Sequence, residues 1–353
     1  MDILATIATT ILEQMQKPTL SFLIAGMMLA ALGSRFEVPE PVYKFIVIVL
    51  LLKVGMNAGI SIRDADLMSL LVPGIGACLV GIGIVLIGSR TLARLKGVSE
   101  IDGLATAGLF GAVSASTLAA GMAILDDEGV AYEGFIGALY PFMDIAALVT
   151  AITMAKLSAA RKTATNVTIN AGGTMTAGGP RRAPAEDTNM IRDILVETLR
   201  SPAISALLAG LALGILARPE TVYASFYEPL FRGLLSILML IMGMEAWARF
   251  AELRKVAHAY ILYGITAPIL HGLLGFGVGM IAHELTGFSA GGVILLAVMA
   301  ASSSDISGPP TIRAALPEAN SSAYVGTSTG LGTPIAILSI PLFIALAEVF
   351  IRL

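Results

Sequence analysis

The chain has 353 residues, of which 56% are hydrophobic and only 13% are charged, and its formal net charge is -3 at pH 7. A soluble domain has about a quarter charged residues, so this chain lacks the polar surface that water requires. The small negative net charge also excludes a polybasic nucleic-acid-binding protein. The composition indicates an all-α integral membrane protein that has the lipid bilayer as its solvent.

Apolar stretches long enough to cross a bilayer recur along the chain. The sequence predicts about ten spanning helices of roughly 20 residues each. They fall at approximately 18–34, 41–60, 68–89, 101–124, 131–157, 200–217, 227–248, 257–282, 288–313 and 321–351. Residues 158–190 are rich in Gly, Thr and Ala and lack apolar periodicity, which predicts a flexible linker.

Lys and Arg gather in the loops on one side of the predicted membrane. Arg90, Arg94 and Lys96 follow the third span, and Arg181 and Arg182 lie in the linker. Cytoplasmic loops carry an excess of these residues. The linker is therefore predicted to be cytoplasmic, and both termini are then outside.

The two halves of the chain, residues 1–157 and 191–353, resemble each other. Residues 13–32 align with 197–216 at one fixed offset, with Gly26 opposite Gly210. Three matches follow in the same order: Gly55-Met56 with Gly243-Met244, Ser114–Thr117 with Ser302–Asp305, and Gly137–Pro141 with Gly330–Pro334. Because five spans per half is an odd number, the halves are predicted to be 5+5 inverted repeats, the usual construction of secondary transporters. The alternative is an old duplication that is unrelated to transport.

Spans four and nine carry the most polar stretches inside the predicted membrane. Pro309 and Pro310 cannot continue a helix, although proline is tolerated in the first turn of a new one. Span nine is therefore predicted to break near Ser302–Asp305 and to restart as a second half-helix. In span four, Gly111 permits a turn and Ser114 can cap a helix, which predicts a similar break. Interrupted backbone at this depth survives only where it lines a polar cavity.

The inversion brings the N-termini of two half-helices toward one point near the midplane, where the broken helices cross. Each N-terminus carries roughly +0.5 of a charge and free N–H donors, which suits a small monovalent anion. The first half-helices end at the same place, where carbonyl oxygens and serine hydroxyls can hold a hard cation such as Na+.

Ionisable residues inside the spans leave alternatives open. Asp305 binds the coupling cation, or it only caps its half-helix, and both roles are compatible. Asp144 is either a cation or proton site or a support for the broken span beside it. Lys53, Asn57 and Glu245 have either a structural role or a role in transport.

Three rival functions belong to other classes. A sodium/proton antiporter would use Asp144 and Asp305 as its exchange pair. An anion channel would carry its ion without sodium. A membrane-embedded enzyme would need a nucleophile or a metal-binding set, and spans four and nine lack the His, Glu or Cys that such chemistry usually recruits.

Several segments closely resemble one known family. They include GLFGAVSASTLAAGMAIL, GALYPFMDIAALVTAI, LFRGLLSILMLIMGMEAW and SSSDISGPPT. These segments are similar to the cyanobacterial sodium-dependent bicarbonate transporter family, SbtA. The likeness covers nearly all of the predicted membrane part, and the chain departs from the family in its short central linker.

The resemblance implies a homotrimeric sodium/bicarbonate symporter in the plasma (inner) membrane that supplies a CO2-concentrating mechanism. It implies an elevator-type movement of a core domain, approximately 68–157 plus 257–351, against a gate domain, approximately 18–60 plus 200–249. It also implies a cytoplasmic PII-like regulator, SbtB, that binds adenine nucleotides. No catalytic residues are expected, because the family transports rather than converts its substrate.

The family's binding residues carry over by motif. The bicarbonate site is assigned to Ser114, Ala115, Ser116, Thr117, Ser302, Ser303 and Ser304. The site of the co-transported Na+ is assigned to Ser116, Thr117, Ser304, Asp305, Ser307 and Asp144.

Overall fold

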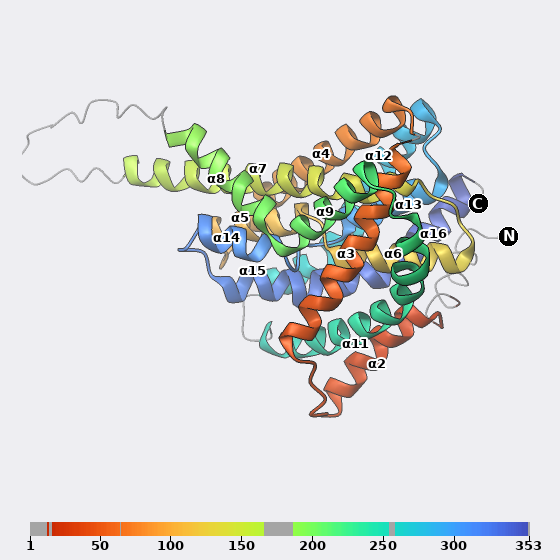
Figure 1. Ribbon diagram of the computed structural model, residues 1–353. Coiled ribbons are helices and arrows are strands. Elements are labelled where there is room, and N and C mark those ends of the chain that lie inside the picture. The colour runs from red at the N-terminus through yellow and green to blue at the C-terminus, as the bar shows by residue number, and fades with distance from the viewer. Residues whose placement is uncertain (1–12, 14–15, 64, 166–185, 254–257, 352–353) are drawn as a thin grey trace, which may run out of the picture.

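The computed structural model describes residues 13, 16–63, 65–165, 186–253 and 258–351, and every regular element in these ranges is helical (Figure 1). The α-helices are α2 (Pro18–Ala31), α3 (Glu40–Ile62), α4 (Leu67–Arg90), α5 (Glu100–Gly111), α6 (Ala115–Glu128), α7 (Leu139–Thr165), α8 (Glu186–Arg200), α9 (Pro202–Leu216), α10 (Glu220–Val222), α11 (Glu228–Leu253), α12 (His258–Thr286), α13 (Ala290–Ala301), α14 (Gly308–Ala315), α15 (Ser321–Thr327) and α16 (Thr333–Phe350). Short 3-10 or π-helical turns are η1 (Leu92–Arg94), η2 (Gly134–Ala138), η3 (Tyr223–Tyr227) and η4 (Ser328–Gly332).

The linker predicted for residues 158–190 is helical at both of its ends. Helix α7 continues to Thr165 and α8 begins at Glu186, so both ends of 158–190 are helical. Residues 166–185 of the predicted linker lie outside the described residues.

Seven helical segments in the described part of the chain are long and apolar enough to cross a bilayer, and up to eight if the bent pair α8–α9 counts as one span. That pair bends by 74° between Arg200 and Pro202. Helices α2 and α13 are apolar but have only 14 and 12 residues, fewer than the roughly 17 that a spanning helix needs. The chain is thus a multi-pass membrane protein, and the count of ten spans stays a prediction.

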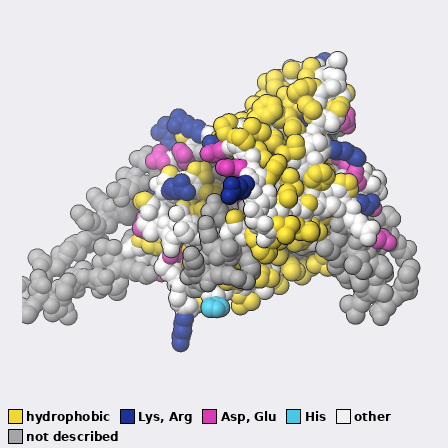
Figure 2. Space-filling view, turned by 90° about the horizontal axis from the view of Figure 1, so that it is seen from below, with side chains coloured by type: hydrophobic (Ala, Val, Ile, Leu, Met, Phe, Trp, Pro, Cys, Tyr) yellow, Lys and Arg dark blue, Asp and Glu magenta, His cyan; other side chains and the backbone are white. Residues whose placement is uncertain are grey.

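The molecule carries the apolar surface that a bilayer requires. Leu79 on α4 and Leu270 on α12 are largely exposed. Figure 2 shows hydrophobic side chains over the middle of one face and charged side chains toward its two sides. By contrast, the most apolar stretch of α5–α6 is 100% buried. The helix pair that carries the first half of the predicted site is therefore enclosed by protein and not by lipid.

Local sequence sets several helix starts. Ser99 accepts a hydrogen bond from the Asp102 N–H, Ser201 from the Ile204 N–H, and Ser289 from the Gly292 N–H. Each serine is an N-cap that satisfies one of the free donors in the first turn. At the other end of α6, Gly129 adopts a left-handed conformation with φ 68° and ends the helix.

Helices α2 and α11 lie side by side (Figure 1) and approach through glycine. A Cβ atom built on Gly26 would overlap the carbonyl oxygen of Leu240, and one built on Gly243 would overlap that of Leu23. Only glycine permits this backbone contact, because any side chain would push the two helices apart.

Helices α3 and α9 make the corresponding contact. A Cβ atom on Gly55 would overlap the carbonyl oxygen of Leu207, and one on Gly210 would overlap that of Leu52. In the sequence alignment Gly26 stands opposite Gly210, and Gly243 opposite Gly55. The contact between α3 and α9 therefore corresponds to the contact between α2 and α11. Each glycine of one contact is aligned with a glycine of the other contact, in the opposite half of the chain.

Loop contacts define two ends of the molecule. At one end, called here the outer end after the orientation that the sequence predicts, the joined pairs are Arg63 with Glu220, Lys17 with Glu128 at 2.7 Å, Arg232 with Asp127 at 2.6 Å, and the Ser289 N–H with Glu133 at 2.6 Å. The hydrogen bond to Glu128 raises the pKa of the Lys17 ammonium. At the inner end, the Asn320 N–H donates to Asp102 at 2.7 Å.

Candidate functional site

The first predicted interruption is confirmed. Helix α5 ends at Gly111 and α6 begins at Ala115. Between them, Ala112 and Ser114 have extended backbone, and the Ser114 hydroxyl accepts the Thr117 N–H at 3.1 Å. Ser114 is thus the N-cap of the second half-helix, as its residue type predicts.

The second interruption is confirmed as well. Helix α13 ends at Ala301, and α14 begins at Gly308 with two prolines in its first turn. Ser304 Oγ accepts the Gly308 N–H at 2.8 Å, so Ser304 satisfies a donor at the start of α14. The N-cap residue Ser307 makes no such bond; its hydroxyl lies 2.9 Å from Ser304 Oγ.

The two interruptions meet in the interior of the protein. The Ser114 N–H donates to Ser302 Oγ at 2.9 Å, and the Ser304 N–H donates to the carbonyl oxygen of Leu109 at 2.8 Å. Each hydrogen bond runs from the backbone of one broken helix to the other. The sequence predicted this meeting, and Leu109 is a partner that it did not single out.

Asp305 connects the second interruption to the first. Its Oδ2 atom accepts the hydroxyl of Ser116 at 2.9 Å and that of Ser114 at 3.2 Å. Its Oδ1 atom is buried and has no hydrogen-bond partner among the described residues, and the same holds for Thr117 Oγ1. A buried carboxylate oxygen without a donor is costly, so these lone pairs mark a place where a cation would be stabilised.

Both carboxylate oxygens of Asp144, near the start of α7, accept hydrogen bonds from the protein. Its Oδ1 atom accepts the Val113 N–H at 3.1 Å, and its Oδ2 atom accepts the Ser307 hydroxyl at 3.1 Å. Ser307 also lies 3.2 Å from the Tyr140 hydroxyl. These contacts agree with the support role that the sequence left open, because Asp144 holds both interruptions from one side.

Ser303 faces residues that the sequence analysis did not select. Its hydroxyl donates to the carbonyl oxygen of Ser328 at 3.0 Å, and its own carbonyl accepts the Thr333 hydroxyl at 3.1 Å. The Ser328 hydroxyl lies 3.0 Å from the Ser304 carbonyl oxygen. Ser328 begins the π-helical turn η4. Such turns are frequent at functional sites, and the small and polar run STGLGT was the available sequence signal.

The predicted site is closed in this structure. Ser114, Thr117, Ser302, Ser303 and Ser304 are each 0% exposed. A cavity of about 10 Å³ separates Ala115, Ser116 and Ala119 from apolar side chains of α3 and Leu238 of α11. That volume holds about one water molecule.

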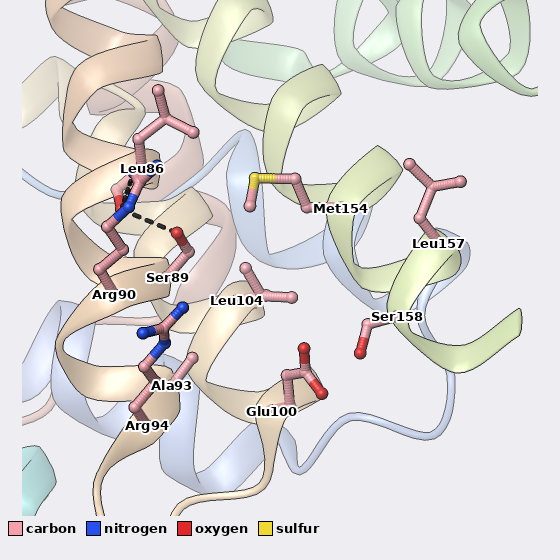
Figure 3. Close-up of a pocket in the computed structure, with 10 residues that line it drawn as sticks. All are labelled: Leu86, Ser89, Arg90, Ala93, Arg94, Glu100, Leu104, Met154, Leu157 and Ser158. Atoms are coloured by element: carbon pink, nitrogen blue, oxygen red, sulfur yellow. Dashed lines mark hydrogen bonds between the residues drawn. The ribbon is translucent and has the colours of Figure 1, made fainter. Parts of the chain in front are cut away.

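A much larger cavity lies elsewhere. It has a volume of about 620 Å³ and is lined at the inner end by Arg90, Arg94, Glu100 and Ser158, among others (Figure 3). None of its lining residues belongs to either interruption. This cavity is therefore separate from the predicted site.

The donor chemistry suits a hard cation. Among the described residues, no group of three His, Cys, Asp or Glu side chains is placed to hold a metal ion. The interruptions instead offer hydroxyl, carbonyl and carboxylate oxygens, the ligands that hard cations prefer.

The sequence-family model of the Na+-dependent bicarbonate transporter superfamily matches residues 18–348. The chain belongs to this superfamily. No curated protein sequence matches it. Membership in the Na+-dependent bicarbonate transporter superfamily supports bicarbonate transport, indicates dependence on sodium and points away from an enzyme. Both interruptions lie inside the matched range.

Proposed function

We propose that the chain is a sodium/bicarbonate symporter. Bicarbonate binds at Ser114, Ala115, Ser116, Thr117, Ser302, Ser303 and Ser304, and sodium binds at Ser116, Thr117, Ser304, Asp305 and Ser307, with Asp144 beside it. The observation that carries this proposal is the Asp305 carboxylate, which accepts two hydroxyls from the other broken helix and keeps one buried oxygen unpaired. The family match supports the identity of both ions.

Coupling follows from electrostatics in a dry site. Bicarbonate meets N–H donors of the half-helices and serine hydroxyls, and sodium meets carbonyl and hydroxyl oxygens and Asp305. Each ion lowers the desolvation cost of the other, so the site binds the two ions together more readily than either ion alone. At a 1:1 ratio the cycle is electroneutral, and a tenfold sodium gradient supplies about 1.4 kcal/mol, enough for roughly tenfold accumulation.

Inverted repeats of five spans each give this site its geometry. The glycine contacts of α2 with α11 and of α3 with α9 support the repeats, because they exchange under the sequence alignment. The shorter helices α2 and α13, with the bent α8–α9 pair, supply the spans that complete the count of ten.

The four glycine-packed helices form a gate domain, and the rest of the membrane part forms a core domain that moves like an elevator. The gate comprises approximately 18–60 plus 200–249, and the core approximately 68–157 plus 257–351. The apolar residues Leu50 and Val54 of α3, which line the small cavity opposite Ser116, support this division. An apolar surface beside the site lets a loaded core slide past α3 without breaking hydrogen bonds at that depth.

The biological setting rests on the family resemblance. The protein lies in the inner (plasma) membrane as a homotrimer, with its linker in the cytoplasm and both termini outside. It supplies inorganic carbon for CO2 concentration, and a PII-like regulator of the SbtB type binds its cytoplasmic side.

Labelled bicarbonate uptake into proteoliposomes tests the proposal. We expect accumulation under an inward sodium gradient, and none above equilibrium in potassium-only buffer. A sodium ionophore provides the control, because it dissipates the gradient without touching the protein. Equal uptake in potassium-only buffer would exclude the coupled mechanism.

A further inference from the structure

A second cavity, with a volume of about 530 Å³, opens at the outer end. Its walls come from α3, η3 and α11 on one side and from the end of α6 with the following loop on the other. In the proposed division, these are the gate and the core. The cavity, called here the outer vestibule, therefore lies on the boundary between the two moving parts.

Lys53 of α3 is the buried charge of the outer vestibule. It is 5% exposed, and its ammonium lies 4.1 Å from the ring centroid of Phe231 and 5.8 Å from that of Tyr223. Within the described part of the chain, no carboxylate pairs with Lys53 and no acceptor takes a hydrogen bond from it. The three N–H donors of this ammonium are thus left to whatever occupies the cavity.

The contact of Lys53 with aromatic rings does not offset the free-energy cost of burying its charge. A cation over an aromatic ring gains about 0.5–2 kcal/mol. Removing an ammonium from water costs several kcal/mol even after the protein relaxes. The difference favours an acceptor in the cavity: water satisfies the N–H donors, and a small anion satisfies both the donors and the charge.

The acidic residues of the outer vestibule do not cancel this charge. Asp126 and Glu228 are exposed, so water screens them, and Asp126 already accepts the Tyr132 hydroxyl at 2.9 Å. Arg232 pairs with Asp127. The strongest unscreened charge is therefore positive and lies where α3 faces the core.

Helix α3 also connects the outer vestibule to the closed site. Lys53 and Asn57 line the vestibule, while Leu50 and Val54 line the small cavity beside Ser116. Leu50 and Lys53 are three positions apart, a rise of about 4.5 Å along a helix. An anion held at Lys53 is thus about one helical turn from residues that border the central site.

We infer that the outer vestibule is a second anion site, in which Lys53 collects bicarbonate from the outside before the core takes it up. The inference rests on the proposed function, because it names the route to the same central site.

Uptake kinetics in proteoliposomes test the role of Lys53. Lys53→Met keeps most of the length of the side chain and removes the charge, and we expect its KM for bicarbonate to rise about tenfold, equivalent to about 1.4 kcal/mol, with little change in maximal rate. Lys53→Arg should restore most of the affinity. Lys44→Met is the matched control: it removes an exposed lysine of α3 that pairs with Glu40, and its KM should equal that of the wild type.

A transport-free measurement keeps the inference testable if Lys53→Met moves no substrate. Line broadening of 13C-bicarbonate by the chain in sodium-free nanodiscs should persist in Asp305→Asn and disappear in Lys53→Met. An unchanged KM in Lys53→Met, or broadening that persists in it, overturns the outer site. Sodium-independent uptake by the wild type instead overturns the proposed function, so the two failures are distinguishable.

Discussion

The backbone N–H of Ser114 donates a hydrogen bond of 2.9 Å to the hydroxyl of Ser302, the residue opposite it in the alignment of the two halves. Two equivalent residues touch only if both lie close to the axis that relates their repeats. The bond therefore places both interruptions near the proposed two-fold axis. A site on this axis faces each half of the protein in the same way, which suits a substrate that must be reached from both sides of the membrane.

Asp305→Asn should weaken sodium binding and leave the fold intact. The amide oxygen can still accept the hydroxyls of Ser114 and Ser116, but the negative charge beside the unpaired oxygen is lost. We expect the sodium concentration for half-maximal uptake to rise at least about tenfold, equivalent to about 1.4 kcal/mol. The measurement is the initial rate of bicarbonate uptake over a sodium titration.

Asp102→Asn is the matched control for this variant. It removes a carboxylate charge from α5, the first half of the same broken span, while its side-chain oxygen can still accept the Asn320 N–H. Its sodium titration should match that of the wild type. If Asp305→Asn shows the same half-saturation as the control, Asp305 is not a sodium ligand.

Asp144 should matter for stability more than for sodium. Asp144→Ala leaves the buried Val113 N–H without an acceptor, which costs about 1–3 kcal/mol. Asp144→Asn retains one acceptor oxygen and should be less destabilising. Thermal unfolding in detergent should therefore rank wild type above Asn, and Asn above Ala.

Sodium titration of Asp144→Asn separates support from ligation. Because both carboxylate oxygens of Asp144 are already hydrogen-bonded to the protein, its half-saturation should stay within about threefold of the wild type, less than 1 kcal/mol. A loss comparable to that of Asp305→Asn would show that Asp144 contacts the ion directly.

The sequence predicts the interruptions because their causes are local. Pro309 and Pro310 forbid a continuous helix, and Ser114 caps one, so both breaks are visible in the residues themselves. The contacts of the Asp305 carboxylate, by contrast, are not determined by neighbouring residues in the sequence. Both of its donors lie almost two hundred positions away in the first half of the chain, at Ser114 and Ser116.

The partners of Ser303 were missed for the same reason. Ser328 and Thr333 reach Ser303 only because η4 packs against the second interruption, and no spacing rule links those positions. Hydropathy alone also does not determine the number of spans. The apolar helix α13 ends at Ala301, after 12 residues, so length no longer separates a broken span from a short buried helix.

Cysteine labelling should separate the two ends of the molecule. In a Cys78→Ser background, Arg218→Cys places an exposed thiol near the outer-end residue Glu220, and Glu318→Cys places one near Asn320 at the inner end. A membrane-impermeant maleimide added to intact cells should label Arg218→Cys at once. It should label Glu318→Cys only after permeabilisation. The reverse pattern would invert the predicted orientation of the whole chain.

Glycine substitutions on α11 test whether helix contact holds the proposed gate together. Gly243 and Gly233 lie on the same helix, but a Cβ atom on Gly243 would overlap the carbonyl oxygen of Leu23, whereas nothing lies within 4 Å of one on Gly233. Gly243→Ala should therefore force α2 and α11 apart, at a cost of about 1–3 kcal/mol. Gly233→Ala should be neutral or stabilising by up to about 1 kcal/mol, because alanine favours a helix.

Thermal unfolding in detergent measures both glycine variants under one condition. The expected order of melting temperatures is Gly233→Ala at or above the wild type, and Gly243→Ala below it. Gly55→Ala, at the position that the alignment places opposite Gly243, should repeat the loss, because its Cβ atom would overlap the carbonyl oxygen of Leu207 on α9. If Gly55→Ala and Gly243→Ala both melt with the wild type, close helix packing does not stabilise the proposed gate.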